Sequence, residues 1–126
     1  MLVRGIRGAT VAQADQPEAI LEATRRLLEA ILAANPQLRT DQIASALFTV
    51  TADLNAAYPA AAARQMGWSD VPLMCAREID VPTGLPRCIR VLLHWNTDLE
   101  QTAVRHVYLE EAQRLRPDLS SQGEEA

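Results

Sequence analysis

The sequence contains 126 residues, 48% hydrophobic and 22% charged, which is typical of one globular domain with a single core. A net charge of −4 argues against general affinity for nucleic acid, and no apolar run is long enough to span a membrane. Two cysteines make no disulfide framework and the N-terminus lacks the apolar core of a signal peptide, so we expect a cytoplasmic protein. All twelve basic residues are arginine, which excludes a lysine Schiff base and a lysine-containing phosphate loop.

The N-terminal third of the chain predicts one strand and one long helix. Residues 2–10 alternate between two faces, which indicates an opening strand that carries Arg7. Glycines weaken this strand but often mark a close approach by another chain or by a ligand. Pro17 favours a helix start, and apolar residues continue at helical spacing until Asn35 and Pro36 end the helix.

Shorter elements are predicted in the middle of the chain. Residues 40–46 are expected to form a short capped helix, followed by a second strand over residues 47–51. An alanine-rich short helix is expected over residues 58–66. The run over residues 71–79 then predicts a third strand, which carries Glu78.

The run from Leu85 to Asn96 predicts the central strand, because it is apolar, rich in branched residues and free of glycine. One face would be buried, since it carries only large apolar side chains: Ile89, Val91, Leu93 and Trp95. The other face carries Arg90 in the middle of the strand, where burial of an unpaired charge costs several kcal/mol or more. Arg90 therefore needs an anion, which is either a protein carboxylate or a ligand.

The C-terminal part of the chain is less regular. Residues 97–100 predict a turn or short helix, residues 105–109 a short strand or a helical turn, and residues 110–115 a helix. Polar residues 120–126 predict a flexible tail. We therefore predict one α+β domain over residues 1–119, with a mixed β-sheet of about five strands packed on one long helix. One helix leaves the other sheet face open, and self-association would cover it.

Motifs for a nucleophile, a zinc site or a phosphate loop are absent from the sequence, so we expect no metal and no cofactor. What the sequence does contain is a set of arginines on predicted strands, Arg7 and Arg90, with one strand carboxylate, Glu78. An internal ion pair of Glu78 with either arginine explains this pattern about equally well. One arginine would still be in excess, with Arg4 and Arg77 adding to it, and a small molecule with two carboxylates would neutralise that charge.

Several short motifs follow one another along nearly the whole chain. They are Arg4-Gly5-Ile6-Arg7-Gly8-Ala9-Thr10, Tyr58-Pro59-Ala60 with Arg64, Val71-Pro72 with Cys75 and Glu78, Cys88-Ile89-Arg90-Val91, and Arg105-His106-Val107-Tyr108-Leu109 with Leu115-Arg116-Pro117-Asp118-Leu119. In this order they resemble the monofunctional chorismate mutases of the trimeric pseudo-α/β-barrel class, rather than the all-helical class. The opening motif and the Arg-His-Val-Tyr-Leu motif together carry the resemblance.

This resemblance implies a homotrimer with a central pseudo-barrel and an active site in each cleft between neighbouring subunits. The reaction would be the Claisen rearrangement of chorismate to prephenate, in phenylalanine and tyrosine biosynthesis. Arg90 would act catalytically beside the ether oxygen of the breaking bond, and Glu78 and Cys75 would face the ring hydroxyl. The other matching positions would bind or enclose the substrate: Arg7, Tyr108, Arg64, Tyr58, Leu73, Met74, Leu115 and Arg116.

Two other functions are compatible with the same residues. One is an imine deaminase of the Rid family, which has a similar trimeric fold and also binds a substrate carboxylate through arginine; this rests on analogy of fold alone. The other is a non-catalytic trimer that binds an aromatic dicarboxylate, because a site without proton-transfer groups has the same residues whether it binds or catalyses.

Overall fold

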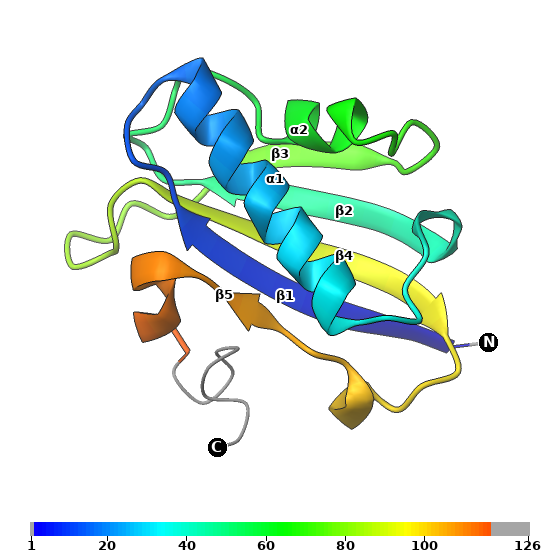
Figure 1. Ribbon diagram of the computed structural model, residues 1–126. Coiled ribbons are helices and arrows are strands. Elements are labelled where there is room, and N and C mark those ends of the chain that lie inside the picture. The colour runs from blue at the N-terminus through cyan, green and yellow to red at the C-terminus, as the bar shows by residue number, and fades with distance from the viewer. Residues whose placement is uncertain (1, 117–126) are drawn as a thin grey trace.

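In the computed structural model, which describes residues 2–116, five strands form one sheet in the order β3-β2-β4-β1-β5 (Figure 1). The strands are β1 (Leu2–Val11), β2 (Ile43–Val50), β3 (Leu73–Arg77), β4 (Cys88–Thr97) and β5 (Val107–Tyr108). Strand β4 lies in the centre, antiparallel to β1 and β2, whereas the edge strands β3 and β5 run parallel to β2 and β1. The predicted α+β architecture with a mixed five-stranded sheet is confirmed.

Helix α1 (Pro17–Ala34) lies across one face of this sheet (Figure 1). Pro17 occupies the first turn, where its missing N–H removes no helical hydrogen bond. The apolar side of the helix and the inner face of the sheet form one buried cluster, which includes Leu27, Leu28, Ile31, Ile6, Phe48, Val91, Leu93 and Trp95. A Cβ atom on Gly8 would lie 2.8 Å from Ile31 Cδ1, so glycine permits the close approach of helix and strand.

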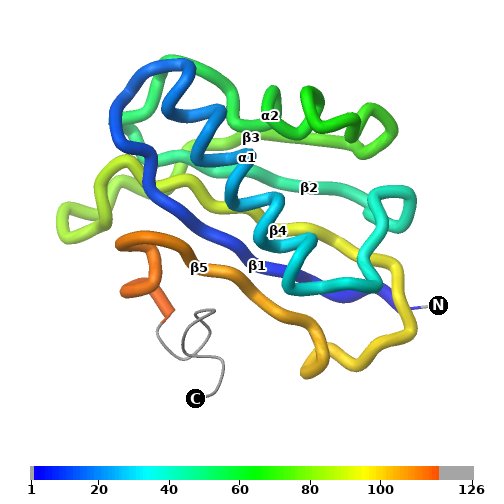
Figure 2. Tube along the Cα trace, in the orientation of Figure 1, coloured from blue at the N-terminus to red at the C-terminus, as the bar shows by residue number. Residues whose placement is uncertain are grey.

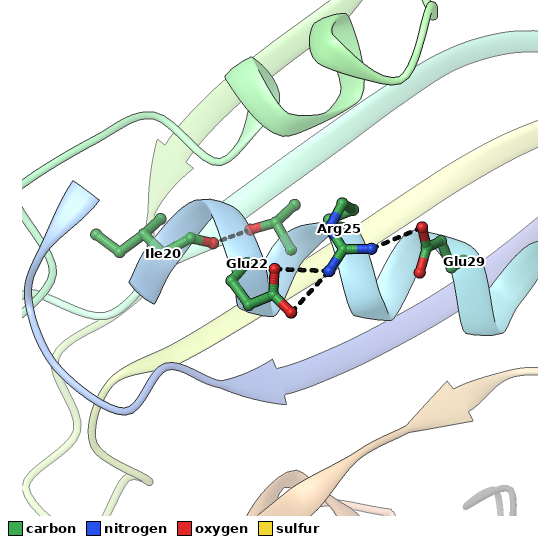
Figure 3. A network of polar contacts seen from close by, with 5 residues as sticks. Ile20, Glu22, Arg25 and Glu29 are labelled. Atoms are coloured by element: carbon green, nitrogen blue, oxygen red, sulfur yellow. Dashed lines mark hydrogen bonds and ion pairs between the residues drawn. The ribbon is translucent and has the colours of Figure 1, made fainter. Parts of the chain in front are cut away.

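The outer side of α1 is polar and solvent-exposed. Arg25 bridges two carboxylates there, with Nη2 2.6 Å from an oxygen of Glu22 and Nη1 2.8 Å from an oxygen of Glu29 (Figure 3). Solvent-exposed ion pairs at this spacing add little to stability, so the helix is held mainly by its buried side. No helix within residues 2–116 is long and apolar enough to cross a membrane.

The prediction of a helix over residues 40–46 is wrong beyond its first turn. A 3-10 turn, η1 (Thr40–Gln42), is followed directly by strand β2. Ile43 and Ala46 are buried and pair with Trp95 and Leu93 of β4. Burial and strand pairing in the sheet therefore outweigh the local preference of these residues for a helix. The predicted short helix over residues 58–66 is present but shorter, as α2 (Ala60–Gln65).

Strand β4 begins three residues later than predicted, because the chain turns at Arg87. This residue has a φ of 50°, in the left-handed region that a strand does not use. The turn is held by Asp53, whose carboxylate oxygens accept the Arg87 N–H at 2.9 and 3.1 Å. Thr51 Oγ1 accepts the next N–H, from Cys88, at 2.9 Å, which fixes the start of the central strand.

The segment after β4 runs along the outer edge of β1 (Figure 2). It contains η2 (Gln101–Ala103), β5 and η3 (Glu110–Arg114), so residues 105–109 contribute a short strand and the last predicted helix is a 3-10 helix. The predicted polar tail over residues 120–126 lies outside the described residues.

Candidate active site

The face of the sheet opposite α1 carries Arg90 near its middle. Directly paired residues of neighbouring strands point to the same face, and the row through Arg90 contains Ala9 on β1, Thr49 on β2 and Ala76 on β3. These neighbours are all small, and 47% of the Arg90 side chain is exposed. The backbone of Arg90 is therefore fixed in the sheet, while these small neighbouring side chains leave its guanidinium uncovered.

Glu78 supplies one of the two kinds of anion predicted for Arg90, a protein carboxylate. It follows β3 directly, because the strand predicted over residues 71–79 covers only Leu73–Arg77. Its Oε2 lies 3.4 Å from Arg90 Nε, and the same oxygen accepts a hydrogen bond from the Thr49 hydroxyl. The contact uses Nε, the guanidinium nitrogen nearest the backbone. Because the side chain is about half exposed, the outer edge of the guanidinium can still meet an anionic ligand. The two interpretations of Arg90, ion pair or ligand site, are thus compatible.

Arg7 lies on the same face, two residues along β1 from the neighbour of Arg90, and its side chain is exposed. The other two strand arginines do not join this group, which corrects the prediction that they add to its charge. Arg4 donates from Nε to the Leu99 carbonyl at 2.7 Å, and Arg77 donates to the Ala52 carbonyl at 3.1 Å. Arg7 and Arg90 are therefore the two strand arginines on the open face, and the Glu78 carboxylate pairs with Arg90.

Tyr108 and Leu115 come together beside β1. Tyr108 pairs with Ala9, which places it on the same face as Arg90 and two strands away. Its ring is buried in an apolar cluster with Leu115, Leu85, Ala9, Val11 and Ala112. Arg116 follows directly and is half-buried. Strands β1 and β5 therefore collect one subset of the predicted site residues: Arg7, Tyr108, Leu115 and Arg116.

A second subset lies at the opposite edge, around β3 and α2. Tyr58 is 72% exposed and lines a cavity of about 440 Å³ together with Cys75. Met74 is 67% exposed on the open face, and Arg64 is exposed on α2. Leu73 and Cys75 pack against the main core, so they lie on the helix side of the sheet, away from Arg90. Within one chain Cys75 does not join Arg90, and its catalytic assignment stays a prediction.

The two subsets are too far apart for one chain to surround a small ligand. Edge strands β3 and β5 are separated by four strand spacings, which amounts to roughly 19 Å. Arg90 lies between them on the central strand. A complete pocket built from all the predicted residues therefore needs the β3 edge of a second copy.

Sequence reasoning missed two polar residues that hold this arrangement. Thr49, on the neighbouring strand β2, donates a hydrogen bond to the Glu78 carboxylate. The sequence indicated this role only by placing a polar threonine directly after the buried Phe48, and so on the opposite face of the strand. His106 accepts the Arg7 backbone N–H on Nδ1 at 2.9 Å. It was visible only as part of the C-terminal motif. No group of three metal-ligating side chains occurs within residues 2–116.

The two thiols differ in environment, which gives a first testable prediction. Burial raises the pKa of Cys88, against the opposing effect of the Arg90 charge, whereas Cys75 is half-buried beside a cavity. With an excess of an aromatic disulfide reagent at pH 8, we expect one thiol to react rapidly and the second only after unfolding. Cys75→Ser should remove the rapid phase and Cys88→Ser the slow one. Equal rates for the two thiols in the folded protein would contradict this.

The fold and the open face define an α+β protein with two exposed arginines, Arg7 and Arg90, on the sheet face opposite its long helix. A family profile described as chorismate mutase type I matches residues 3–119. The chain therefore belongs to the chorismate mutase type I family, and it is an isomerase of aromatic amino acid biosynthesis.

Individual relatives agree with this assignment. The chain is 58% identical over 120 residues to the chorismate mutase AroH of Thermus thermophilus, covering 95% of this chain and 98% of that protein. It is 46% identical over 121 residues to the chorismate mutase AroH of Bacillus subtilis, covering 95% and 94% of the two chains. A solved chorismate mutase from Clostridium thermocellum superposes with a TM-score of 0.85 at 47% identity, over 87% of this chain and 97% of that one.

Proposed function

We propose that the protein rearranges chorismate to prephenate in clefts between the subunits of a homotrimer in the cytoplasm, with Arg90 beside the ether oxygen of the bond that breaks. The observation that carries this proposal is the exposed guanidinium of Arg90 on the open sheet face, supported from below by Glu78 and Thr49. Membership of the chorismate mutase family supplies the reaction.

The chemistry requires little from the protein beyond position and charge. In the rearrangement one C–O bond breaks while one C–C bond forms, and no proton is transferred and no covalent enzyme intermediate is needed. Negative charge develops on the ether oxygen in the transition state, so a fixed cation there binds the transition state more strongly than the substrate. An acceleration of about a millionfold requires roughly 8 kcal/mol, which electrostatic stabilisation and preorganisation can supply together.

The remaining residues would hold the substrate in its reactive chair. Arg7 and Tyr108 would bind the carboxylate of the enolpyruvyl side chain, which folds that side chain over the ring. Glu78 would face the ring hydroxyl while it keeps Arg90 Nε in place. Tyr58 and Arg64, from the β3 edge, would close the pocket.

A trimer would bring the two subsets of residues together. The open face of the sheet carries Leu47, Leu92 and the exposed Met74, apolar side chains that a second copy would cover. Cyclic association places the β3 edge of one subunit against the β5 edge of the next, and three such contacts close the ring. Each cleft would then contain Arg7 and Arg90 from one subunit and Tyr58 and Arg64 from its neighbour.

The first experiment measures the loss of chorismate absorbance near neutral pH, with no added metal or cofactor, and identifies prephenate by its acid conversion to phenylpyruvate. We expect prephenate to form far above the background rate. Light scattering should give three times the chain mass of 13.8 kDa. Hydrolysis of 2-aminoacrylate without prephenate formation would favour the imine deaminase alternative. Saturable binding of prephenate without turnover of chorismate would favour a binding protein.

A further inference from the structure

The outer edge of β1 is paired partly by side chains, because β5 contains only two residues. Leu109 N–H donates to the Ala9 carbonyl at 2.9 Å, which continues the strand ladder by one bond. At Gly5 the Gln101 amide replaces a strand, with one bond of 3.0 Å and one of 2.8 Å. At Arg7, between these two positions, the backbone N–H donates to His106 Nδ1 at 2.9 Å.

This hydrogen bond requires one particular form of the imidazole. Nδ1 accepts a hydrogen bond only when it carries a free lone pair, so the ring must be neutral with its hydrogen on Nε2. Burial lowers the pKa of His106, and the charges of Arg7 and Arg116 lower it further. The ring is therefore neutral at pH 7, in the form that the Arg7 N–H requires.

We propose that His106 is a positioning residue for the reaction: its neutral imidazole fixes the backbone of Arg7 and so sets the place of the guanidinium that binds the substrate carboxylate. This inference rests on the role given to Arg7 in the proposed function. Arg7 lies opposite Leu92 of β4 in the sheet register, so the imidazole fixes the outer edge of a strand whose inner edge is paired with the central strand.

Protonation of the ring would act against this arrangement twice. It would turn Nδ1 into a donor that faces the N–H donor of Arg7, and it would add a third positive charge beside Arg7 and Arg116. The charged groups that act on the ring are the guanidinium groups of Arg7 and Arg116. The neighbouring Arg105 side chain is exposed, and its backbone N–H donates to Asn35 Oδ1 at 2.9 Å. Substrate binding should therefore weaken as the pH falls below the ordinary histidine pKa of 6.5.

Two variants separate the acceptor from the charge. His106→Asn places an amide oxygen near the position of Nδ1 and cannot ionise, whereas His106→Leu removes the acceptor. At pH 7.5 we expect His106→Asn to keep KM for chorismate within about twofold of the parent. His106→Leu should raise KM about tenfold, with a smaller change in kcat, as expected for one lost hydrogen bond that supports substrate binding.

The pH dependence of kcat/KM distinguishes this positioning role from a purely structural role of His106, because a purely structural role would not change it. In the parent, kcat/KM should decrease as the pH falls below 6.5, which gives an acidic limb in the pH profile. His106→Asn should lack that limb. His94→Asn is the matched control, because His94 lies on β4 with Nδ1 2.9 Å from the Ser45 hydroxyl and has no contact with the Arg7 backbone N–H. It should keep the limb of the parent. A limb that persists unchanged in His106→Asn would overturn the proposal.

Two further controls distinguish the ways in which the inference can fail. Gln101→Leu loosens the same edge of β1 at Gly5, so a KM as high as that of His106→Leu would show a general edge effect and overturn the proposal. Arg7→Ala should raise KM strongly, and adding His106→Leu to that variant should change KM little further. If Arg7→Ala leaves KM unchanged, the site assignment itself fails. If it raises KM while His106→Leu does not, only the positioning role fails.

Discussion

Arg90→Ala is expected to lower kcat for chorismate rearrangement by about 10³-fold or more, with a much smaller change in KM. The guanidinium would act on charge that develops only in the transition state, so its loss removes stabilisation that the bound substrate hardly uses. About half of the Arg90 side chain is exposed, and its row neighbours are small. The variant should therefore keep the fold and a free energy of unfolding close to that of the parent.

Arg90→Lys should recover little of this activity. An ammonium group cannot contact Glu78 through an inner nitrogen and present an outer edge to the ether oxygen at the same time, as the planar guanidinium can. Arg39→Ala is the matched control, because this exposed arginine forms an ion pair with Asp41, at 2.7 Å, in the turn before β2 and away from the open face. Steady-state kinetics with far-UV circular dichroism would test the series. Near-normal turnover by Arg90→Ala would remove Arg90 from the catalytic role.

The central strand and the long helix could be predicted from the sequence because their signals are local. Four apolar side chains at every second position predicted the buried face of β4, and each of them is at most 3% exposed in the structure. The α1 pattern likewise has a helical period and a proline in its first turn. By contrast, residues 43–46 follow a capping pattern that favours a helix, and only pairing with β4, about fifty residues away, makes them a strand.

The site was predictable in its charges but not in its geometry. An arginine in the middle of a strand needs an anion whatever its neighbours in the sheet, so Arg90 could be identified as a candidate site residue from its position alone. Its ion pair with Glu78 depends on the order of β4, β2 and β3, which no local pattern gives. Likewise, the role of His106 depends on β5 beginning opposite Gly8, one residue after Arg7, which appears only in the assembled sheet.

Mixed trimers should recover activity from two inactive variants, if each cleft is built from two subunits. Arg7→Ala damages the half of the site on β1, and Arg64→Ala damages the half on α2 beside β3. Strands β1 and β3 of one chain are three strand spacings apart, roughly 14 Å. When the two are unfolded together at equal amounts and refolded, a cyclic trimer takes each half-site from a different neighbour. About one quarter of the clefts should then contain both halves intact, because each half is intact with a probability of about one half.

The matched control mixes Arg7→Ala with Arg90→Ala. Both residues lie on the open face within neighbouring strands, so both changes damage the same half-site and no mixed cleft contains an intact copy of it. This mixture should show only the sum of the two residual activities, while the Arg7→Ala and Arg64→Ala mixture should reach about a quarter of the parent rate per site. Native mass spectrometry of a tagged and an untagged variant would confirm that mixed trimers form. If they form and activity is not restored, the pocket is completed within one subunit, and the β3 edge has another role than closing the site of its neighbour.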